Sequence, residues 1–275
     1  AELRDYICTS FPKTIGAYID SGKNRPDNVR MVKLKNEAVK LAEIFSESST
    51  SSIDLFLSRN PSFENIGKIS IIVSLFEKES KSKFNEKSID FSRDWYFYLF
   101  NRITSDLTRP NKFTQYSQNK ISFITFNYDR SLEHYLYNSM HNSFYDLISI
   151  EPTKHKDILP FKIIHIYGHI APLPWQDEEN GVVYGINRKT RENKVFAENY
   201  IDNIRVIYDR TTSALDSAKH IIEKAKRVFF LGFGFAKENL EALSIPSILN
   251  VNQEIYGTAM GFTDKEINAL QDMFY

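Results

Sequence analysis

The chain has 275 residues, and 35 Lys and Arg residues balance 35 Asp and Glu residues, so its formal net charge is zero. A balanced charge argues against a protein that binds nucleic acid mainly by electrostatics, because such binding depends on clustered positive charge. The single cysteine, Cys8, excludes an internal disulfide framework and a multi-cysteine zinc site. The longest apolar runs are far shorter than the roughly 20 residues of a membrane-spanning helix. We therefore expect a cytoplasmic protein that contacts neither a membrane nor nucleic acid directly.

Residues 25–120 are predicted to be mainly helical. Apolar residues recur at three- and four-residue spacings over 29–45, which is typical of one face of an amphipathic helix. Serines before Ile53 form a helix-start signal, and Pro61 ends that short helix. Two further helices are expected within 65–83 and 92–104, the first of them amphipathic with its lysines and glutamates facing outward.

From residue 121 onward, predicted strands alternate with predicted helices. Short apolar runs of strand length occupy 121–126, 161–168, 227–234 and 254–263. Helical patterns occupy 127–140, 193–225 and 264–275. This alternation favours an α/β fold: a Rossmann-like parallel sheet with helices on both faces. We expect a single domain over 1–275, in which 25–120 is a helical insertion or subdomain and 121–275 carries the site.

The first predicted strand leads directly into Asn127, Tyr128 and Asp129. Ligands of open α/β sheets bind beyond the carboxyl ends of the strands, so residues at this position are candidates for a site. The Asn127 amide can both donate and accept hydrogen bonds. A turn or a helix cap is the structural alternative for Asn127 and for Asp129.

The second predicted strand ends in His165, Tyr167, Gly168 and His169. Alternation places His165, Tyr167 and His169 on one face if the strand continues. Gly168 permits a tight turn or the close approach of a ligand. The structural alternative for each histidine is a hydrogen-bonded core or edge residue. No metal site is expected, because two histidines four residues apart suit a helix rather than a strand.

The third predicted strand ends in Gly232, Phe233 and Gly234, and Asn239 follows near the start of a predicted helix. Glycines at such a turn let backbone amides approach a phosphate or a ribose. A lone Gly-x-Gly is equally typical of a tight packing turn.

Four segments in this order resemble the sirtuin-like domain of bacterial anti-phage defence proteins. They read "TFNYDRSLEHYL", "IIHIYGH", "VFFLGFGFAKENLEAL" and "IYGTAMGFTDKEINAL". The resemblance extends over residues 50–275 and implies that NAD is the ligand. It implies an NAD hydrolase (NADase) that cleaves the nicotinamide–ribose bond, yielding nicotinamide and ADP-ribose and depleting NAD during abortive infection.

By motif position, the catalytic asparagine of that family corresponds to Asn127 and its catalytic histidine to His165. Many members read His-x-His-Gly at this strand end, where this chain has Tyr167, and whether His165 or His169 is essential stays open. Asn127 would hold the ribose or the attacking water, and His165 would accept a proton, since the ordinary pKa of histidine lies near neutrality. The resemblance assigns NAD contacts to Tyr128, Asp129, Gly168, Gly232, Phe233, Gly234 and Asn239. Zinc-dependent deacylation is not expected, because one cysteine cannot form the four-cysteine module of sirtuin deacylases.

The resemblance also implies assembly into a homo-oligomer or a larger defence complex, with control by a phage-derived trigger. Members usually open with a glycine–alanine–glycine–serine loop that residues 1–60 lack, so we expect this chain to be part of a larger protein. If the site itself lacks that loop, the alternative is a catalytically silent sensor of NAD or ADP-ribose, or an oligomerisation module.

Overall fold

The computed structural model describes residues 2–18, 28–50, 52–82, 84, 94–107, 119–148, 159, 161–186, 197–206 and 213–274. The helices before the first strand are α1 (Glu2–Thr9), α2 (Phe11–Thr14), α3 (Asn28–Glu47), α4 (Ile53–Arg59), α5 (Glu64–Ser80) and α6 (Trp95–Thr104), with single turns η1 (Ile15–Ala17) and η2 (Pro61–Phe63). Later helices are α8 (Ser131–Ser143), α9 (Tyr145–Ile148), η7 (Ala197–Asn203), α10 (Ser213–Lys224), α11 (Lys237–Ala242) and α12 (Asp264–Phe274). Of the helix predicted over 193–225, η7 and α10 form, and the remainder lies outside the described residues apart from short irregular stretches.

Side-chain caps explain where two of the early helices begin. The Ser52 hydroxyl accepts a hydrogen bond from the Leu55 amide at 3.2 Å, which confirms the predicted start of α4. The Asp94 carboxylate accepts a hydrogen bond from the Tyr96 amide at 2.9 Å and caps α6 in the same way.

Helix α5 is more deeply buried than its sequence predicts. It contacts α1, α3 and η7, so apolar residues on most of its sides are buried. The Ser70 and Ser74 hydroxyls are also buried, and each donates to a backbone carbonyl of the preceding turn at 2.6 Å. The prediction that its glutamates face outward is wrong for Glu79, which is buried against a partner described below.

The strands form two separate parallel pairs of four residues each. Strand β1 (Ser122–Thr125) pairs with β2 (Lys162–His165), and β3 (Arg227–Phe230) pairs with β4 (Glu254–Gly257). The fold is therefore mixed α/β and mostly helical, and within the described residues no continuous sheet joins the two pairs.

Three of the strands end well before the sequence predicts, because a backbone turn interrupts each predicted run. Strand β2 stops at His165, and Gly168 then adopts a φ of +82°. The expectation that His165, Tyr167 and His169 share one face of a continuing strand is therefore not met. Strand β3 stops at Phe230, before Gly232 with its φ of +60°. Strand β4 stops at Gly257 rather than continuing to 263, and Gly261 lies in a turn with a φ of +89°.

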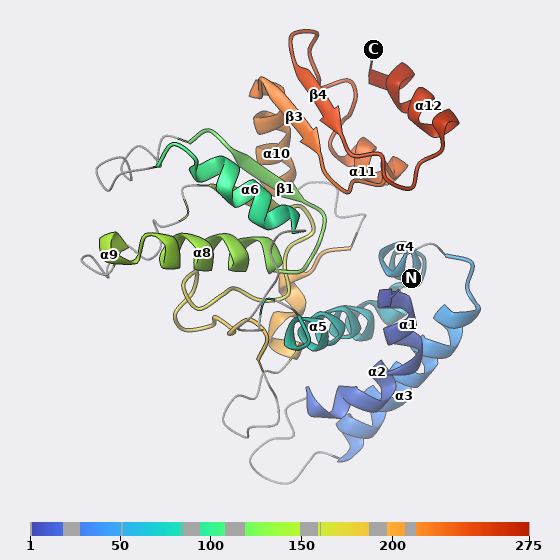
Figure 1. Ribbon diagram of the computed structural model, residues 1–275. Helices are drawn as coiled ribbons and strands as arrows, with labels where there is room; N and C mark the ends of the chain where they lie inside the picture. The colour runs from blue at the N-terminus through green and yellow to red at the C-terminus, as the bar shows by residue number, and fades with distance from the viewer. Residues whose placement is uncertain are drawn as a thin grey trace.

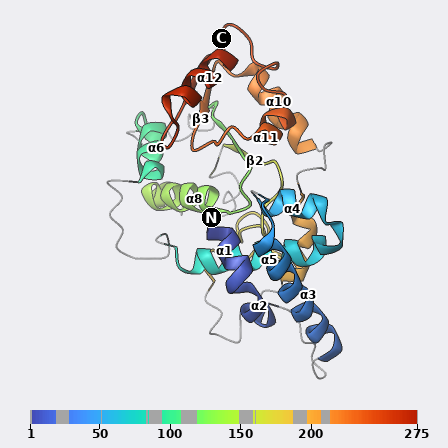
Figure 2. The same cartoon turned by 90° about the vertical axis from the view of Figure 1, so that its right-hand side faces the viewer.

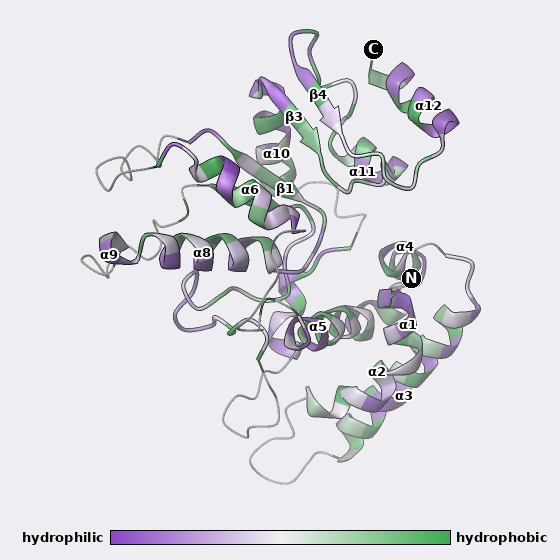
Figure 3. Ribbon diagram, in the orientation of Figure 1, coloured by the Kyte–Doolittle hydropathy of each residue, from purple (hydrophilic) through white to green (hydrophobic). Residues whose placement is uncertain are grey.

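Helices α1, α2 and α3 lie at one end of the molecule, and the β3–β4 pair with α10, α11 and α12 lies at the other (Figures 1 and 2). The larger hydrophobic core runs from the first helices to the β3–β4 region. A smaller core lies between α6 and α8, whose ribbons carry both apolar and polar residues (Figure 3). Among the described helices, none combines the length and apolarity needed to cross a membrane.

Candidate functional site

The three strand ends that the sequence singles out lie together in the structure. The His165 ring nitrogen Nδ1 is 2.8 Å from the backbone carbonyl oxygen of Asn127, which joins the ends of β2 and β1. The ring centroids of Phe126 and Phe233 are 5.7 Å apart, which brings the loop after β3 to the same place. The Tyr167 hydroxyl donates to Asn239 Oδ1 at 3.4 Å. Residues from all three segments therefore meet at one edge, beyond the carboxyl ends of β1 and β2.

Asn127 is an exposed member of this group. Its amide N–H donates to Thr125 Oγ1 at 3.0 Å, and its carbonyl faces His165, so both of its backbone polar groups are engaged. Its side chain is exposed. The arrangement leaves the Asn127 amide free to meet a ligand from outside the fold while its backbone is held in place.

His165 is almost fully buried, with 8% of its side chain exposed. Its second ring nitrogen, Nε2, lies 3.1 Å from Glu133 Oε1, and the Glu133 side chain is 2% exposed. Burial lowers the pKa of His165, but the bonds to Glu133 and to the Asn127 carbonyl, with the charge of Asp129, together raise it above its ordinary value. Both ring nitrogens are thus occupied by protein groups.

Tyr128 and Asp129 both use their side chains within the protein. Tyr128 is buried, and its hydroxyl lies 2.5 Å from Asp54 Oδ1 and 2.8 Å from the Arg205 carbonyl oxygen. Burial, reinforced by Asp54, raises the pKa of Tyr128 well above its usual value. Asp129 Oδ1 accepts a hydrogen bond from the Ser131 amide at 3.1 Å, at the start of α8. The capping alternative for Asp129 is therefore present in the structure, and contact of either side chain with NAD stays a prediction.

A close backbone contact requires glycine at position 168. A Cβ atom at this position would lie 1.7 Å from the Asn203 carbonyl oxygen, at the end of η7. The next residue, His169, has a ring centroid 5.4 Å from that of His165, and its Nδ1 atom is buried with no hydrogen-bond partner. Burial and the neighbouring His165 lower the pKa of His169. Tyr167, between the two histidines, has its pKa raised to about 12 by burial and by Asp54.

The loop after β3 is open where the sequence places its glycines. A Cβ atom at Gly232 or at Gly234 would meet no heavy atom within 4 Å. The Gly232 amide donates to Thr258 Oγ1 at 2.8 Å, which ties the loop to the end of β4. Phe233 packs against Phe126, and Asn239 lies in α11 beside Tyr167. The backbone of this loop is therefore accessible to a ligand on the side of its glycines.

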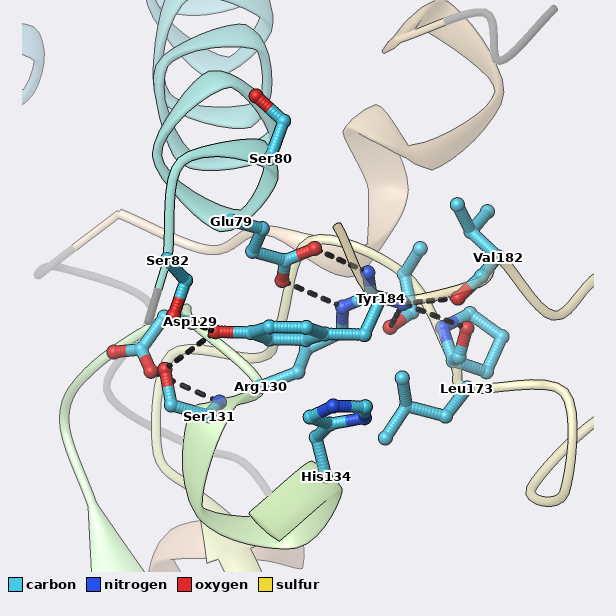
Figure 4. Close-up of polar contacts among 12 residues, drawn as sticks. Glu79, Ser80, Ser82, Asp129, Arg130, Ser131, His134, Leu173, Val182 and Tyr184 are labelled. Atoms are coloured by element: carbon cyan, nitrogen blue, oxygen red, sulfur yellow. Dashed lines mark hydrogen bonds and ion pairs between the residues drawn. The ribbon is translucent and has the colours of Figure 1, made fainter. Parts of the chain in front are cut away.

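A buried ion pair that the sequence analysis missed holds together segments next to the candidate site. Arg130 is fully buried, and its guanidinium donates to Glu79 from Nε at 3.0 Å and from Nη2 at 2.6 Å (Figure 4). Its Nη1 donates to the carbonyl oxygens of Pro172 at 3.1 Å and of Val182 at 2.7 Å. Arg130 thus ties the segment after β1 to α5 and to the loop that follows β2.

Glu133 is a further residue that the sequence analysis missed. It lies in the quoted segment "TFNYDRSLEHYL", but the helical pattern of that segment gives no sign of its partner. Its bond to His165 joins residues 32 positions apart, so only the tertiary fold brings them together. Among the residues that the structure describes, no three His, Cys, Asp or Glu side chains are grouped closely enough to hold a metal ion.

His134 is a partly buried histidine that predicts a loss of stability in acid. Its ring stacks on Tyr184 with centroids 3.9 Å apart (Figure 4), and burial together with the charge of Arg130 lowers its pKa to about 4. The unfolded chain therefore binds this proton more readily than the folded chain, and stability falls as the pH drops from about 6.5 towards 4. We expect a loss of about 2 kcal/mol from this group, measured as the free energy of urea unfolding at pH 7 and at pH 4.5. His134→Gln should reduce that loss, whereas His220→Gln, at an exposed position, should retain it.

No protein-family model matches the chain, and no curated protein or solved structure shows a significant similarity to it. The resemblance to sirtuin-like domains therefore contributes to the function only as part of the proposal that follows.

Proposed function

We propose that the chain is an NAD glycohydrolase whose site lies where the three strand ends meet. The observation that carries the proposal is the meeting of Asn127, His165 and the Gly232–Gly234 loop at one edge, in the order that the resemblance implies. We further propose that the β1–β2 and β3–β4 pairs belong to a Rossmann-like core, with α3–α6 as its helical subdomain. The parallel pairing within both pairs supports this interpretation.

Cleavage of the nicotinamide–ribose bond mainly requires the protein to orient NAD and a water molecule. Nicotinamide is already a cationic leaving group in NAD, and cleavage develops positive charge on the ribose, as in glycoside hydrolysis. The exposed Asn127 amide is suited to hold a ribose hydroxyl or the attacking water. The open loop at Gly232 and Gly234 is suited to the adenosine diphosphate part. His165 is held by contacts at both ring nitrogens, so it would act as a base only after one contact opens and that nitrogen is free of hydrogen.

Release of nicotinamide from NAD by the purified protein tests the proposal. Asn127→Ala and His165→Ala should each lower the rate by about 100-fold or more, the usual contribution of an orienting or acid–base group. Asn142→Ala, at an exposed position on α8, is the matched control and should leave the rate unchanged. Turnover that survives both site substitutions would contradict the assignment.

Gly234→Ala should weaken NAD binding without weakening the fold. A methyl group at Gly234 would meet open space, so we expect the free energy of unfolding to stay within about 0.5 kcal/mol of its original value. The same methyl group would stand where the proposed diphosphate approaches the backbone. We expect the dissociation constant for NAD, measured by calorimetry, to rise about 10-fold. Gly16→Ala is the control, and equal affinities for the two variants would argue against a diphosphate at this loop.

The second candidate function is a catalytically silent sensor of NAD or ADP-ribose. The occupation of both His165 ring nitrogens favours it, because a base needs one of them free. A sensor would be stabilised against heat by NAD without releasing nicotinamide. In either case we propose action in the cytoplasm, within a homo-oligomer or a larger defence complex that a phage-derived trigger controls. Turnover measured over a range of protein concentrations, with and without phage lysate, tests that dependence.

A further inference from the structure

The bond between His165 and Glu133 points to a role for a residue to which the sequence motifs assign none. Glu133 lies on α8, and its Oε1 atom is 3.1 Å from His165 Nε2. Its other oxygen, Oε2, is buried and has no hydrogen-bond partner. Burying a carboxylate costs free energy, so a carboxylate in this place needs a cation nearby. His165 is the group in hydrogen-bond contact with it.

The hydrogen-bond partners of His165 limit where its protons can be. A backbone carbonyl oxygen can only accept, so the 2.8 Å contact with the Asn127 carbonyl requires a hydrogen on Nδ1. A carboxylate anion also only accepts, so an anionic Glu133 calls for a second hydrogen on Nε2, whereas a neutral Glu133 carboxyl would itself donate to Nε2. A ring with both hydrogens is an imidazolium cation, and its pair with Glu133 is neutral overall.

The other charged groups around His165 come from three segments. Asp129, after β1, favours the cationic ring. His169, after β2, disfavours a second positive charge, and burial lowers the pKa of its own ring. Arg130, at the start of α8, is engaged by Glu79 through two hydrogen bonds. Glu133 is therefore the carboxylate that decides the charge of His165 through direct contact.

We propose that Glu133 is a positioning residue of the site: it keeps His165 doubly protonated, and the resulting imidazolium holds the Asn127 carbonyl so that the Asn127 side chain faces outward. The first half of this inference concerns the free protein, and only its consequence for NAD rests on the proposed function. His165 then orients Asn127 in the resting protein and does not act as the base. An imidazolium is deprotonated as the pH rises, so its orienting effect on Asn127 should weaken. A catalytic base would instead become more active as it is deprotonated.

Nitrogen-15 spectra of the histidine rings test the protonation state directly. In the unaltered protein at pH 7, we expect both ring nitrogens of His165 to carry hydrogen, with His165→Gln identifying its signals. Glu133→Gln removes the carboxylate charge and keeps the shape, so the titration midpoint of His165 should fall by about one to three pH units. Glu223→Gln, at an exposed position on α10, is the matched control and should leave that midpoint unchanged.

A neutral His165 at pH 7 in the unaltered protein would overturn the proposal, and this result needs no variant to fold. An unchanged midpoint in folded Glu133→Gln would overturn it as well. The NAD arm is separate: turnover and NAD affinity should decline as the pH rises through the His165 midpoint, and Glu133→Gln should move that decline to lower pH. Activity that instead rises through this midpoint would refute the positioning role. If the protein neither binds nor cleaves NAD, the proposed function fails, while the spectra still decide the role of Glu133 in the free protein.

Discussion

Arg130→Met is expected to lower the free energy of unfolding by about 3–5 kcal/mol, the usual cost of removing one partner of a buried ion pair. The substitution leaves the Glu79 carboxylate buried without its cation. It also removes a donor to the carbonyl oxygens of Val182 and Pro172, of which Pro172 keeps the hydrogen bond from the Val182 amide. Burial already raises the pKa of Glu79 against the opposing effect of Arg130, so loss of Arg130 should drive this carboxyl towards its neutral form. Urea unfolding at pH 7 measures the change.

Two further variants separate this effect from a general effect of losing an arginine. Arg227→Met breaks the ion pair with Glu254 on the surface of the β3–β4 pair, where both side chains are more than half exposed at 64% and 53%. Such a pair contributes about 1 kcal/mol at most. The double variant Glu79→Met with Arg130→Met should recover part of the loss, because no uncompensated charge remains buried. A cost below about 1 kcal/mol for Arg130→Met alone would contradict the structural role of this pair.

Gly168→Ala is expected to destabilise the fold by about 4 kcal/mol or more, which places it among the most harmful single substitutions. Two effects act together at this position. The φ of +82° is unfavourable for any residue with a Cβ atom, and that atom would lie 1.7 Å from the Asn203 carbonyl oxygen. Because the clash is with the backbone, a change of rotamer cannot relieve it. Thermal unfolding followed by circular dichroism measures the loss.

Gly232→Ala separates backbone strain from this clash. Gly232 also has a positive φ, at +60°, but its added methyl group would meet no heavy atom within 4 Å. We therefore expect a cost of about 1–2 kcal/mol, from strain alone. Equal losses of unfolding free energy for Gly168→Ala and Gly232→Ala would show that the contact with Asn203 does not constrain the turn after β2.

Short-range signals predicted the elements but not their extent. The apolar runs at 121–126 and 227–234 contain β1 and β3, because strand propensity is a local property. The end of β3 depends on a backbone conformation at Gly232 that apolar patterning does not reveal. The two strand pairs also require distant segments to meet, and local patterning does not reveal whether the pairs join into one sheet.

The sequence predicted only part of the candidate site, because local motifs do not reveal contacts between distant segments. The motif positions identified Asn127 and His165, and the structure brings them into contact. The contact uses the Asn127 backbone carbonyl rather than its side chain, a detail of geometry that spacing cannot supply. Glu133 and the Glu79–Arg130 pair escaped the sequence analysis, because a helical pattern does not distinguish a solvated charge from one buried against a distant partner.

Nicotinamide release from NAD, compared between the unaltered protein and Asn127→Ala, tests the central claim most directly. The proposal predicts release by the unaltered protein, at a rate that Asn127→Ala lowers by about 100-fold while NAD still binds. If the unaltered protein neither releases nicotinamide nor gains thermal stability from NAD at any protein concentration, with or without phage lysate, the meeting of the three strand ends is not an NAD site.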